Sequence, residues 1–169
     1  MTRLQVTEVI NRSPEEVFRF VATDHFENHP KWDPSVVEIV QTSAGPLKVG
    51  TTARLTRLDR GKRIEGTVEI TEYEPHRRFA AVVSFGPFTL HQSVTIEPVG
   101  TDSSRLTLTI NTQATGPTRL LLPLLRGVFA RTMRESLRRI KEMVERSRGV
   151  SGRVNGPEIA GGGDSTPAQ

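Results

Sequence analysis

The segment "TRLLLPLLRGVFARTMRESLRRIKEMVERSR", residues 118–148, carries the longest periodic pattern in the chain. Its apolar residues recur every three or four positions, which is the spacing of one face of an α-helix. This pattern predicts one long amphipathic C-terminal helix, with a bend in its first turns at Pro123 and Gly127. The apolar stripe consists of Leu121, Leu125, Phe129, Met133, Leu137, Ile140 and Val144, and Leu124, Val128 and Met143 widen it.

The same segment carries the positive charge of the protein. It has nine Arg or Lys residues and three Glu residues, whereas the rest of the chain has 14 basic and 16 acidic residues. A basic helix face can contact nucleic acid or anionic lipid, or it can simply face water. The sequence lacks the stacking aromatic residues that accompany a basic surface in single-strand binding, so we expect no nucleic-acid partner.

Seven stretches before this helix alternate apolar and polar residues with the period of two that is typical of β-strands. Short turns separate several of them, for example at Arg60-Gly61 and Gly86-Pro87. Such a succession indicates an antiparallel meander with one buried face and one solvated face. The predicted strands lie at residues 3–10, 35–42, 51–59, 62–75, 77–85, 88–98 and 104–114.

Two short helical segments are predicted between the first and second strands. The stretch "SPEE", residues 13–16, is a capping box with a proline at the first helical position. The stretch "DHFENHP", residues 24–30, forms a second short turn, which we expect Pro30 to stop. Trp32, the single tryptophan of the chain, then falls in a loop between two prolines.

The order of these elements predicts an α+β fold in one domain, residues 1–148. A seven-stranded antiparallel sheet with one buried face needs a cover, and the C-terminal helix is the one sizeable segment that can provide it. The sheet must therefore curl around that helix. Residues 149–169 are rich in Gly, Ser and Pro without an apolar period, and they predict a disordered tail.

Targeting and redox signals are sparse in the sequence. The chain has no cysteine, which excludes disulfides and thiolate chemistry. We find no signal-peptide pattern at the start and no apolar run near the ~20 residues that a spanning helix needs. We therefore expect a cytoplasmic protein, and the sequence does not indicate its oligomeric state.

The order and spacing of the elements resemble the START-like, helix-grip superfamily, also called SRPBCC, and within it the polyketide cyclase/dehydrase-like branch. The resembling stretches are "SPEEVFRFVAT", "HPKWDPSVVEIV", "GPLKVGTTARL" and "EGTVEITEYEPHRRF", followed by the basic, Leu-rich helix. In that superfamily an apolar ligand such as a lipid, sterol, hormone or polyketide lies between sheet and helix. The resemblance implies binding or transport of a small hydrophobic or amphipathic ligand, with no cofactor.

We expect a hollow between sheet and helix that is large enough for a fatty-acid-sized molecule. Trp32 is predicted to turn inward at one end of it, next to Phe26, either as a plug of the open end or as a ligand contact. The predicted lining residues are Phe26, Trp32, Leu55, Phe79, Phe85, Phe88, Leu90, Gln92, Leu108, Ile110, Leu121, Leu125 and Phe129.

Gln92 falls where the alternation predicts the interior. It lies in mid-strand, and a buried amide without partners costs about 1–3 kcal/mol, so it either bonds a neighbour or awaits a polar group of a ligand. For residues 51–59 the inward series is either Ala53, Leu55 and Arg57 or Arg54, Thr56 and Leu58, and the first keeps more apolar side chains inside. Arg57 would hold a carboxylate or an enolate, or lie at the rim with its guanidinium in water. The alternative to a binding protein is a polyketide cyclase or aromatase, in which Arg57 or Gln92 polarises a carbonyl group.

His25 and His29 are four residues apart, a spacing that on a helix points both side chains the same way. The metalloprotease pattern has Glu directly after the first His, whereas this chain has Phe26 there, so we expect no metal and interpret both histidines as partly exposed. The pattern offers no inward His or carboxylate pair as acid and base, which disfavours the enzyme. A further alternative is transient contact of the basic helix with a membrane surface during lipid exchange.

Overall fold

The computed structural model describes residues 2–59 and 61–147. The predicted tail at 149–169 lies outside the described residues, as does the side chain of Leu121.

One seven-stranded antiparallel sheet makes up most of the fold, in the order β1-β7-β6-β5-β4-β3-β2. Each strand lies within two residues of its predicted bounds. The strands are β1 (Thr2–Ile10), β2 (Val36–Gln41), β3 (Thr52–Asp59), β4 (Lys62–Glu74), β5 (Arg78–Phe85), β6 (Phe88–Gly100) and β7 (Ser103–Ala114).

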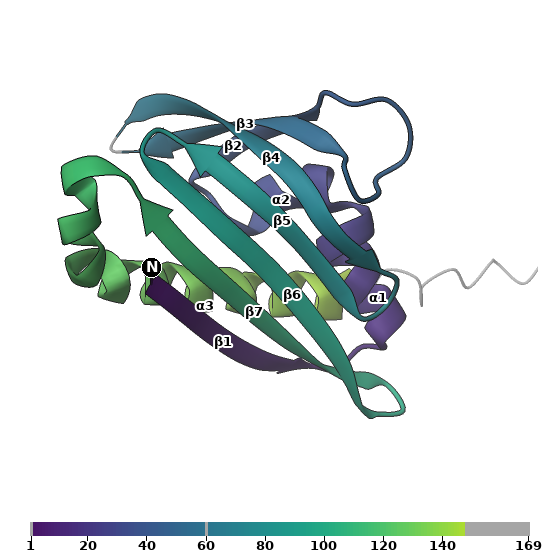
Figure 1. The fold of residues 1–169 in the computed structure, drawn as a ribbon. Coiled ribbons are helices and arrows are strands. Elements are labelled where there is room, and N and C mark those ends of the chain that lie inside the picture. The colour runs from purple at the N-terminus through teal and green to yellow at the C-terminus, as the bar shows by residue number, and fades with distance from the viewer. Residues whose placement is uncertain (1, 60, 148–169) are drawn as a thin grey trace, which may run out of the picture.

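The helices lie on one face of this twisted sheet, and the long C-terminal helix runs along it (Figure 1). This is the predicted α+β, helix-grip arrangement, with short helical segments after the first strand. The helical segments are α1 (Pro14–Phe18), the π-helical turn η1 (Arg19–Thr23), α2 (His25–Trp32), the 3-10 helix η2 (Gly116–Leu121) and α3 (Leu122–Arg146).

The buried face of the sheet follows the predicted alternation. Leu55, Ile70 and Leu106 point into the core and are at most 2% exposed. Gly66 shares this face on β4, where a Cβ atom would lie 2.5 Å from the carbonyl oxygen of Ser84 on β5. The close approach of the two strands therefore requires glycine at this position.

Helix α2 continues through Pro30 and ends at Trp32, so the prediction that Pro30 stops it is wrong. Proline has a helical φ, and its cost in a helix is one lost hydrogen bond and a clash with the preceding turn. Beyond the proline the helix closes normally, because the backbone N–H of Asp33 donates to the carbonyl of His29 at 3.0 Å. We attribute the tolerance of Pro30 to the burial of Trp32, which is 6% exposed at the helix end.

The C-terminal helical region begins with a change of helix type. The 3-10 helix η2 gives way to α3 at Leu122, directly before Pro123, whereas Gly127 lies within α3. Pro123 occupies the first turn of α3, where a backbone N–H has no partner inside the helix. None of the helices in the described ranges is both long and apolar enough to cross a bilayer.

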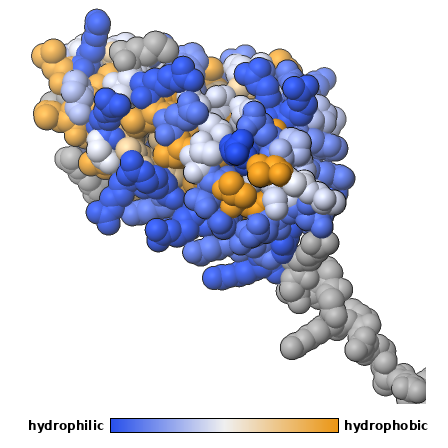
Figure 2. All heavy atoms as spheres, turned by 90° about the horizontal axis from the view of Figure 1, so that it is seen from below, coloured by the Kyte–Doolittle hydropathy of each residue, from blue (hydrophilic) through white to orange (hydrophobic). Residues whose placement is uncertain are grey.

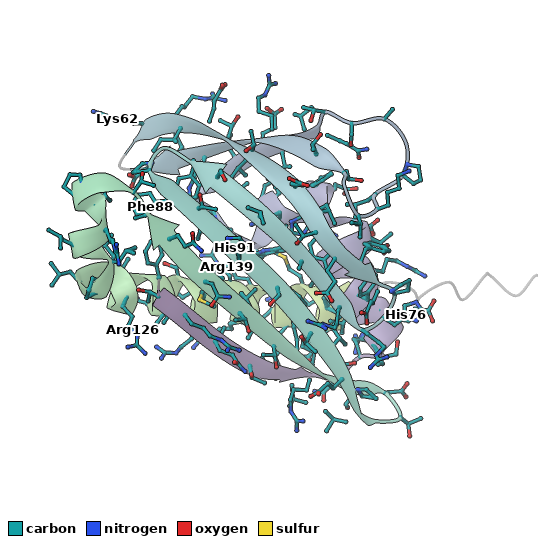
Figure 3. All side chains as sticks on the ribbon, in the orientation of Figure 1. Lys62, His76, Phe88, His91, Arg126 and Arg139 are labelled. Carbon is teal, nitrogen blue, oxygen red and sulfur yellow. The ribbon has the colours of Figure 1, made fainter. Side chains whose placement is uncertain are left out.

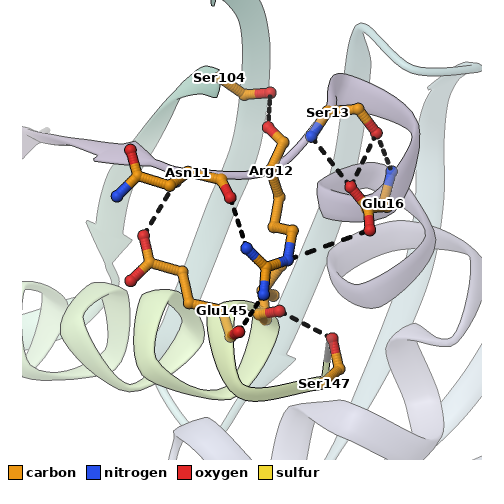
Figure 4. A network of polar contacts seen from close by, with 8 residues as sticks. Asn11, Arg12, Ser13, Glu16, Ser104, Glu145 and Ser147 are labelled. Atoms are coloured by element: carbon orange, nitrogen blue, oxygen red, sulfur yellow. Dashed lines mark hydrogen bonds and ion pairs between the residues drawn. The ribbon is translucent and has the colours of Figure 1, made fainter. Parts of the chain in front are cut away.

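A polar network fastens the end of α3 to the end of β1 (Figure 4). Arg12 is 8% exposed, and its guanidinium donates to the backbone carbonyls of Asn11 and Glu145. The backbone N–H of Asn11 donates to Glu145 Oε1 at 2.9 Å, and Ser104 Oγ donates to the Arg12 carbonyl at 2.7 Å. The cation thus satisfies a carbonyl of the last turn of α3, where the helix dipole favours positive charge.

Candidate functional site

Two small spaces lie between the sheet and α2, and the first of them also borders the C-terminal part of α3. His25, His29 and Gln92 border both of them. The first space is mainly apolar and has a volume of about 40 Å³, and its other lining residues are Val21, Trp32, Phe79, Val94, Leu106, Leu108, Leu137 and Ile140. The second has a volume of about 20 Å³, and its other lining residues are Asp33, Val36, Leu55, Arg57, Val68 and Val83.

These volumes are far below the size of a lipid. A buried water needs about 10–15 Å³ on this measure, whereas pockets for drug-sized ligands measure about 300–1,000 Å³. The expected hollow for a fatty-acid-sized molecule is therefore wrong for this conformation. Trp32, Leu137 and Ile140 border the apolar space and are 6%, 2% and 5% exposed.

Trp32 closes one side of the apolar space. Its ring stacks on His29 with centroids 5.2 Å apart and planes at 18°, and the ring of Phe20 lies at 5.5 Å. The inward orientation agrees with the prediction, but the aromatic neighbours are Phe20, His25 and His29 and not Phe26. The reason is the continued helix, which places residue 32 one turn after residue 29.

His25 and His29 are 6% and 8% exposed, so the interpretation as surface residues is wrong. His25 Nδ1 lies 2.8 Å from the carbonyl oxygen of Val21, and His29 Nδ1 lies 3.1 Å from His25 Nε2. The two side chains point the same way, as their spacing of four residues predicts. Within residues 2–59 and 61–147, no group of three or more His, Asp or Glu side chains is arranged to hold a metal ion.

Both histidines are neutral at pH 7. Burial lowers the pKa of His25 to about 3, and the repulsion that arises when His25 and His29 are both protonated adds to this effect. Burial lowers the pKa of His29 to about 4, with a further contribution from Arg57. His29 Nε2 lies 4.0 Å from Asp33 Oδ2, but because His29 carries no charge, this contact is not an ion pair at neutral pH.

Gln92 takes the inward position that the alternation predicts, and β3 follows the first of its two possible series, with Ala53, Leu55 and Arg57 inward. Arg57 Nη2 donates to Ser35 Oγ at 2.8 Å, and the guanidinium lies 4.6 Å above the centre of the Phe85 ring. Gln92 lies opposite Ala81 and Ile110 in the sheet. Its amide has no hydrogen-bond partner among the described residues, so the two polar groups differ: Arg57 is held, and Gln92 is unpaired.

The predicted lining residues divide into two groups. Trp32, Leu55, Phe79, Gln92 and Leu108 border one of the two spaces. The others border neither space: Leu90 is buried in the core, Phe26 and Ile110 pack at its margin, Phe85 and Phe88 pair with centroids 5.7 Å apart, and Leu125 and Phe129 are half-buried on α3. Phe88 lies at the end of the sheet beside the start of α3, whereas His76 lies at the opposite end (Figure 3).

Sequence reasoning missed the two histidines and placed the cavity too near the start of α3. The residues of α3 that border the apolar space are Leu137 and Ile140, in the C-terminal half of the helix. Both belong to the predicted apolar stripe, so the pattern showed their direction. It did not show which part of the stripe faces the open interior, because that depends on how far α3 extends past the sheet.

The curled antiparallel sheet, the long C-terminal helix and the helical segments after β1 define a START-like, helix-grip domain. The chain belongs to the family described as "Polyketide cyclase / dehydrase and lipid transport", whose model matches residues 1–145. No curated protein matches the sequence.

Solved structures share the fold at low sequence identity. The ZhuI aromatase/cyclase from Streptomyces sp. R1128 is 17% identical with a TM-score of 0.72, over 90% of this chain and 99% of that one. A START superfamily protein from Mycobacterium smegmatis is 17% identical with a TM-score of 0.68, over 84% of this chain and 98% of that one. At these identities the likeness concerns the fold alone.

Proposed function

We propose that this protein binds a small hydrophobic or amphipathic molecule, such as a lipid or a polyketide, between the sheet and α3. One observation carries the proposal: an apolar space bordered by Trp32 and Phe79 is also bordered by Gln92, whose half-buried amide has no hydrogen-bond partner among the described residues. Ligand sites typically combine an apolar lining with a few such polar groups, which orient the ligand. The apolar lining would hold the body of the ligand and Gln92 its polar group.

Binding requires the interior to widen. The described spaces are roughly a tenth of the volume of a typical ligand pocket. Trp32 is the side chain best placed to give way, because it ends α2 directly before the extended residue Asp33. The sequence left open whether Trp32 plugs the open end or contacts the ligand. In this proposal it does the first in the empty protein and the second in the complex.

Trp32 fluorescence tests this proposal, since the chain has no other tryptophan. Titration with a fluorescent long-chain alcohol should quench or shift the emission with a saturable binding curve. Leu108→Phe, which fills the apolar space, should weaken binding about tenfold. Val37→Phe, on the exposed surface of β2, is the matched control and should bind normally. Native mass spectrometry that finds no lipid-sized adduct, together with a flat titration, would refute the proposal.

A polyketide cyclase or aromatase is the second candidate, and a specific observation favours keeping it. His29, Arg57 and Gln92 border the same small space, whereas the sequence had offered no inward histidine. In such an enzyme these groups would polarise a carbonyl and move a proton in a site without water. Separate replacement of Arg57 and Gln92, with affinity and turnover measured on a bound poly-β-ketone, distinguishes the two: a change in affinity alone favours binding.

The start of α3 supports a third candidate, contact with an anionic membrane surface during lipid exchange. Leu120, Leu124 and Val128 are 80%, 76% and 63% exposed. Figure 2 shows apolar side chains gathered at this end of the molecule. Residues 118–131 contain three arginines and no acidic residue, and Arg126 projects outward there (Figure 3). An apolar stripe flanked by arginines fits the interface of an anionic bilayer, whereas a second copy of the same basic surface would be repelled.

A further inference from the structure

A chain of hydrogen bonds fixes the protons of the two buried histidines. It runs from the Val21 carbonyl through the ring of His25 to the ring of His29. A carbonyl oxygen can only accept, so His25 Nδ1 must carry a hydrogen. Since His25 is neutral, its Nε2 has a lone pair and accepts from His29 Nδ1 at 3.1 Å. His29 Nδ1 therefore carries the hydrogen of that ring, and its Nε2 has a free lone pair.

Within the described residues, no N–H or O–H group donates a hydrogen bond to His29 Nε2, and the Arg57 Nη2 that borders the same space donates to Ser35. Asp33 Oδ2 lies 4.0 Å from His29 Nε2 and is itself an acceptor. The other carboxylate oxygen, Oδ1, is already satisfied by the backbone N–H of Ser35 at 3.0 Å and by Ser35 Oγ at 2.6 Å. Arg57 Nη2 donates to that same Ser35 Oγ at 2.8 Å, which fixes the carboxylate and balances its charge. Two hydrogen-bond acceptors, His29 Nε2 and Asp33 Oδ2, therefore lie next to each other beside the second space.

We propose that His29 Nε2 is a specificity determinant that accepts a hydrogen bond from a neutral hydroxyl group of the ligand, whether alcohol, phenol or enol. The inference rests on the proposed binding function and names the ligand class for it. A carboxylate would add a third acceptor to this pair, and Arg57, the cation on the same space, is already engaged with Ser35 Oγ and the Phe85 ring, so a carboxylate is disfavoured. The unpaired amide of Gln92, which borders the same space, supplies an N–H donor to the oxygen of the same or an adjacent group.

His25 has a different role in this proposal, as a positioning residue. Its Nδ1–H is committed to the Val21 carbonyl at 2.8 Å, so its Nε2 is left to accept from His29. Without that acceptor, the ring hydrogen of His29 would be free to move from Nδ1 to Nε2. There the N–H group would point to Asp33 Oδ2 as its acceptor. The lone pair that faces the ligand therefore depends on the residue one turn earlier.

The first test needs no ligand. Long-range ¹H–¹⁵N NMR spectra of the wild-type protein at pH 7 distinguish ring nitrogens that carry a hydrogen from those that do not. We expect His25 and His29 both to carry it on Nδ1. In His25→Leu, the hydrogen of His29 should shift toward Nε2. A wild-type spectrum with the hydrogen on His29 Nε2 would overturn the inference and leave the binding function untouched.

The second test compares three probes of matched shape by equilibrium dialysis: 2-naphthol, 2-methoxynaphthalene and 2-naphthoate. Wild type should bind the naphthol about tenfold more tightly than the ether, which cannot donate, and should bind the carboxylate least. His29→Leu should remove the preference and leave the affinity for the ether within about threefold. His91→Leu, an exposed histidine on β6, is the control and should keep the preference.

The outcomes separate the two proposals. Equal affinity of naphthol and ether in wild type, or an unchanged preference in His29→Leu, refutes the role of His29 while binding stands. Failure of all three probes to bind refutes the binding function for ligands of this class, and the specificity proposal falls with it.

Discussion

The two halves of α3 are both rich in apolar residues and differ in how many of these are exposed, since Leu122 is buried and Leu125 and Phe129 are half-buried beside strongly exposed neighbours in the first half. In the C-terminal half, Met133, Leu137, Ile140 and Val144 are at most 5% exposed. In the N-terminal half and the preceding turn, Leu120, Leu124 and Val128 are more than 60% exposed. A helical stripe therefore marks a face that can be buried, and the partner elements decide whether it is.

The difference comes from what lies beneath each half. The C-terminal half packs on β1 and α2, and the Arg12 network fastens its last turn to the β1–α1 junction. Lys141 adds a 3.0 Å ion pair with Glu8 on β1. At the other end, no element in the described part of the chain covers Leu120, Leu124 or Val128. The buried half is thus the structural half, and the exposed half is available to another partner.

Lowering the pH should cause the largest loss of folding stability, because His25 and His29 lie in the same core as the buried half of α3. Their pKa values are about 3 and 4 in the folded protein, against 6.5 in the unfolded chain. Between pH 6.5 and pH 4 the unfolded chain binds more protons, so lowering the pH favours unfolding. Each histidine should remove up to about 1.4 kcal/mol per pH unit, or about 3–5 kcal/mol together between pH 6.5 and 4.5.

Urea titrations at a series of pH values measure this loss. The double variant His25→Leu/His29→Leu should show a flatter profile in the same window, whereas His91→Leu should follow wild type. Equal slopes in the double variant and wild type would mean that carboxylates alone cause the acid sensitivity.

The next largest effect is a truncation on the buried stripe. Leu137→Ala removes a side chain that is 2% exposed and should cost about 3 kcal/mol of unfolding free energy. Leu124→Ala makes the same chemical change on a side chain that is 76% exposed and should cost less than about 0.5 kcal/mol. Chemical denaturation of both variants measures the contrast, and similar losses would show that the N-terminal half is buried in solution.

The apolar period of two residues in strands and the spacing of three or four residues in the helix were enough to predict the fold. They gave the seven strands, the direction of Gln92 and the stripe of α3, and they left two possible directions for Arg57. Both signals are local and repeat many times, so single exceptions do not obscure them. Gly127, for example, is a weak helix former, yet α3 runs through it.

The site depended on tertiary packing that no local pattern encodes. Pro30 is a strong local stop signal, and it failed because burial of Trp32 outweighs one lost hydrogen bond. That error moved Trp32 into a loop and left His25 and His29 on the surface. The closed interior was also beyond reach, since cavity volume is set by side chains from four or more elements at once.

A smaller loss is expected from the Arg12 network. Arg12→Leu leaves the carbonyls of Asn11 and Glu145 without their donor and should cost about 2 kcal/mol. Arg131→Leu is the matched change on the outer surface of α3, where the pair with Glu135 is exposed, and should change the stability by less than about 0.5 kcal/mol. Thermal unfolding of the two variants provides the comparison, and equal melting temperatures would show that the network adds no net stability.

The smallest effect concerns the exposed half alone, and it tests whether that half binds a membrane. Wild type should bind phosphatidylcholine vesicles that contain phosphatidylglycerol, and the double variant Leu120→Ser/Leu124→Ser should bind about tenfold more weakly at unchanged stability. Val37→Ser/Val40→Ser removes two exposed apolar side chains from β2 and serves as the control.

The arginines make a separate contribution, which salt distinguishes from the apolar one. At physiological ionic strength, charges more than about 8 Å apart are largely screened, so added salt should weaken binding of wild type and of the Leu120→Ser/Leu124→Ser variant by the same factor. Vesicles of phosphatidylcholine alone should bind poorly, because the arginines then lack an anionic partner. Two outcomes would contradict membrane binding by the exposed half of α3. One is equal binding to charged and uncharged vesicles, and the other is an equally large loss of binding in the Val37→Ser/Val40→Ser control.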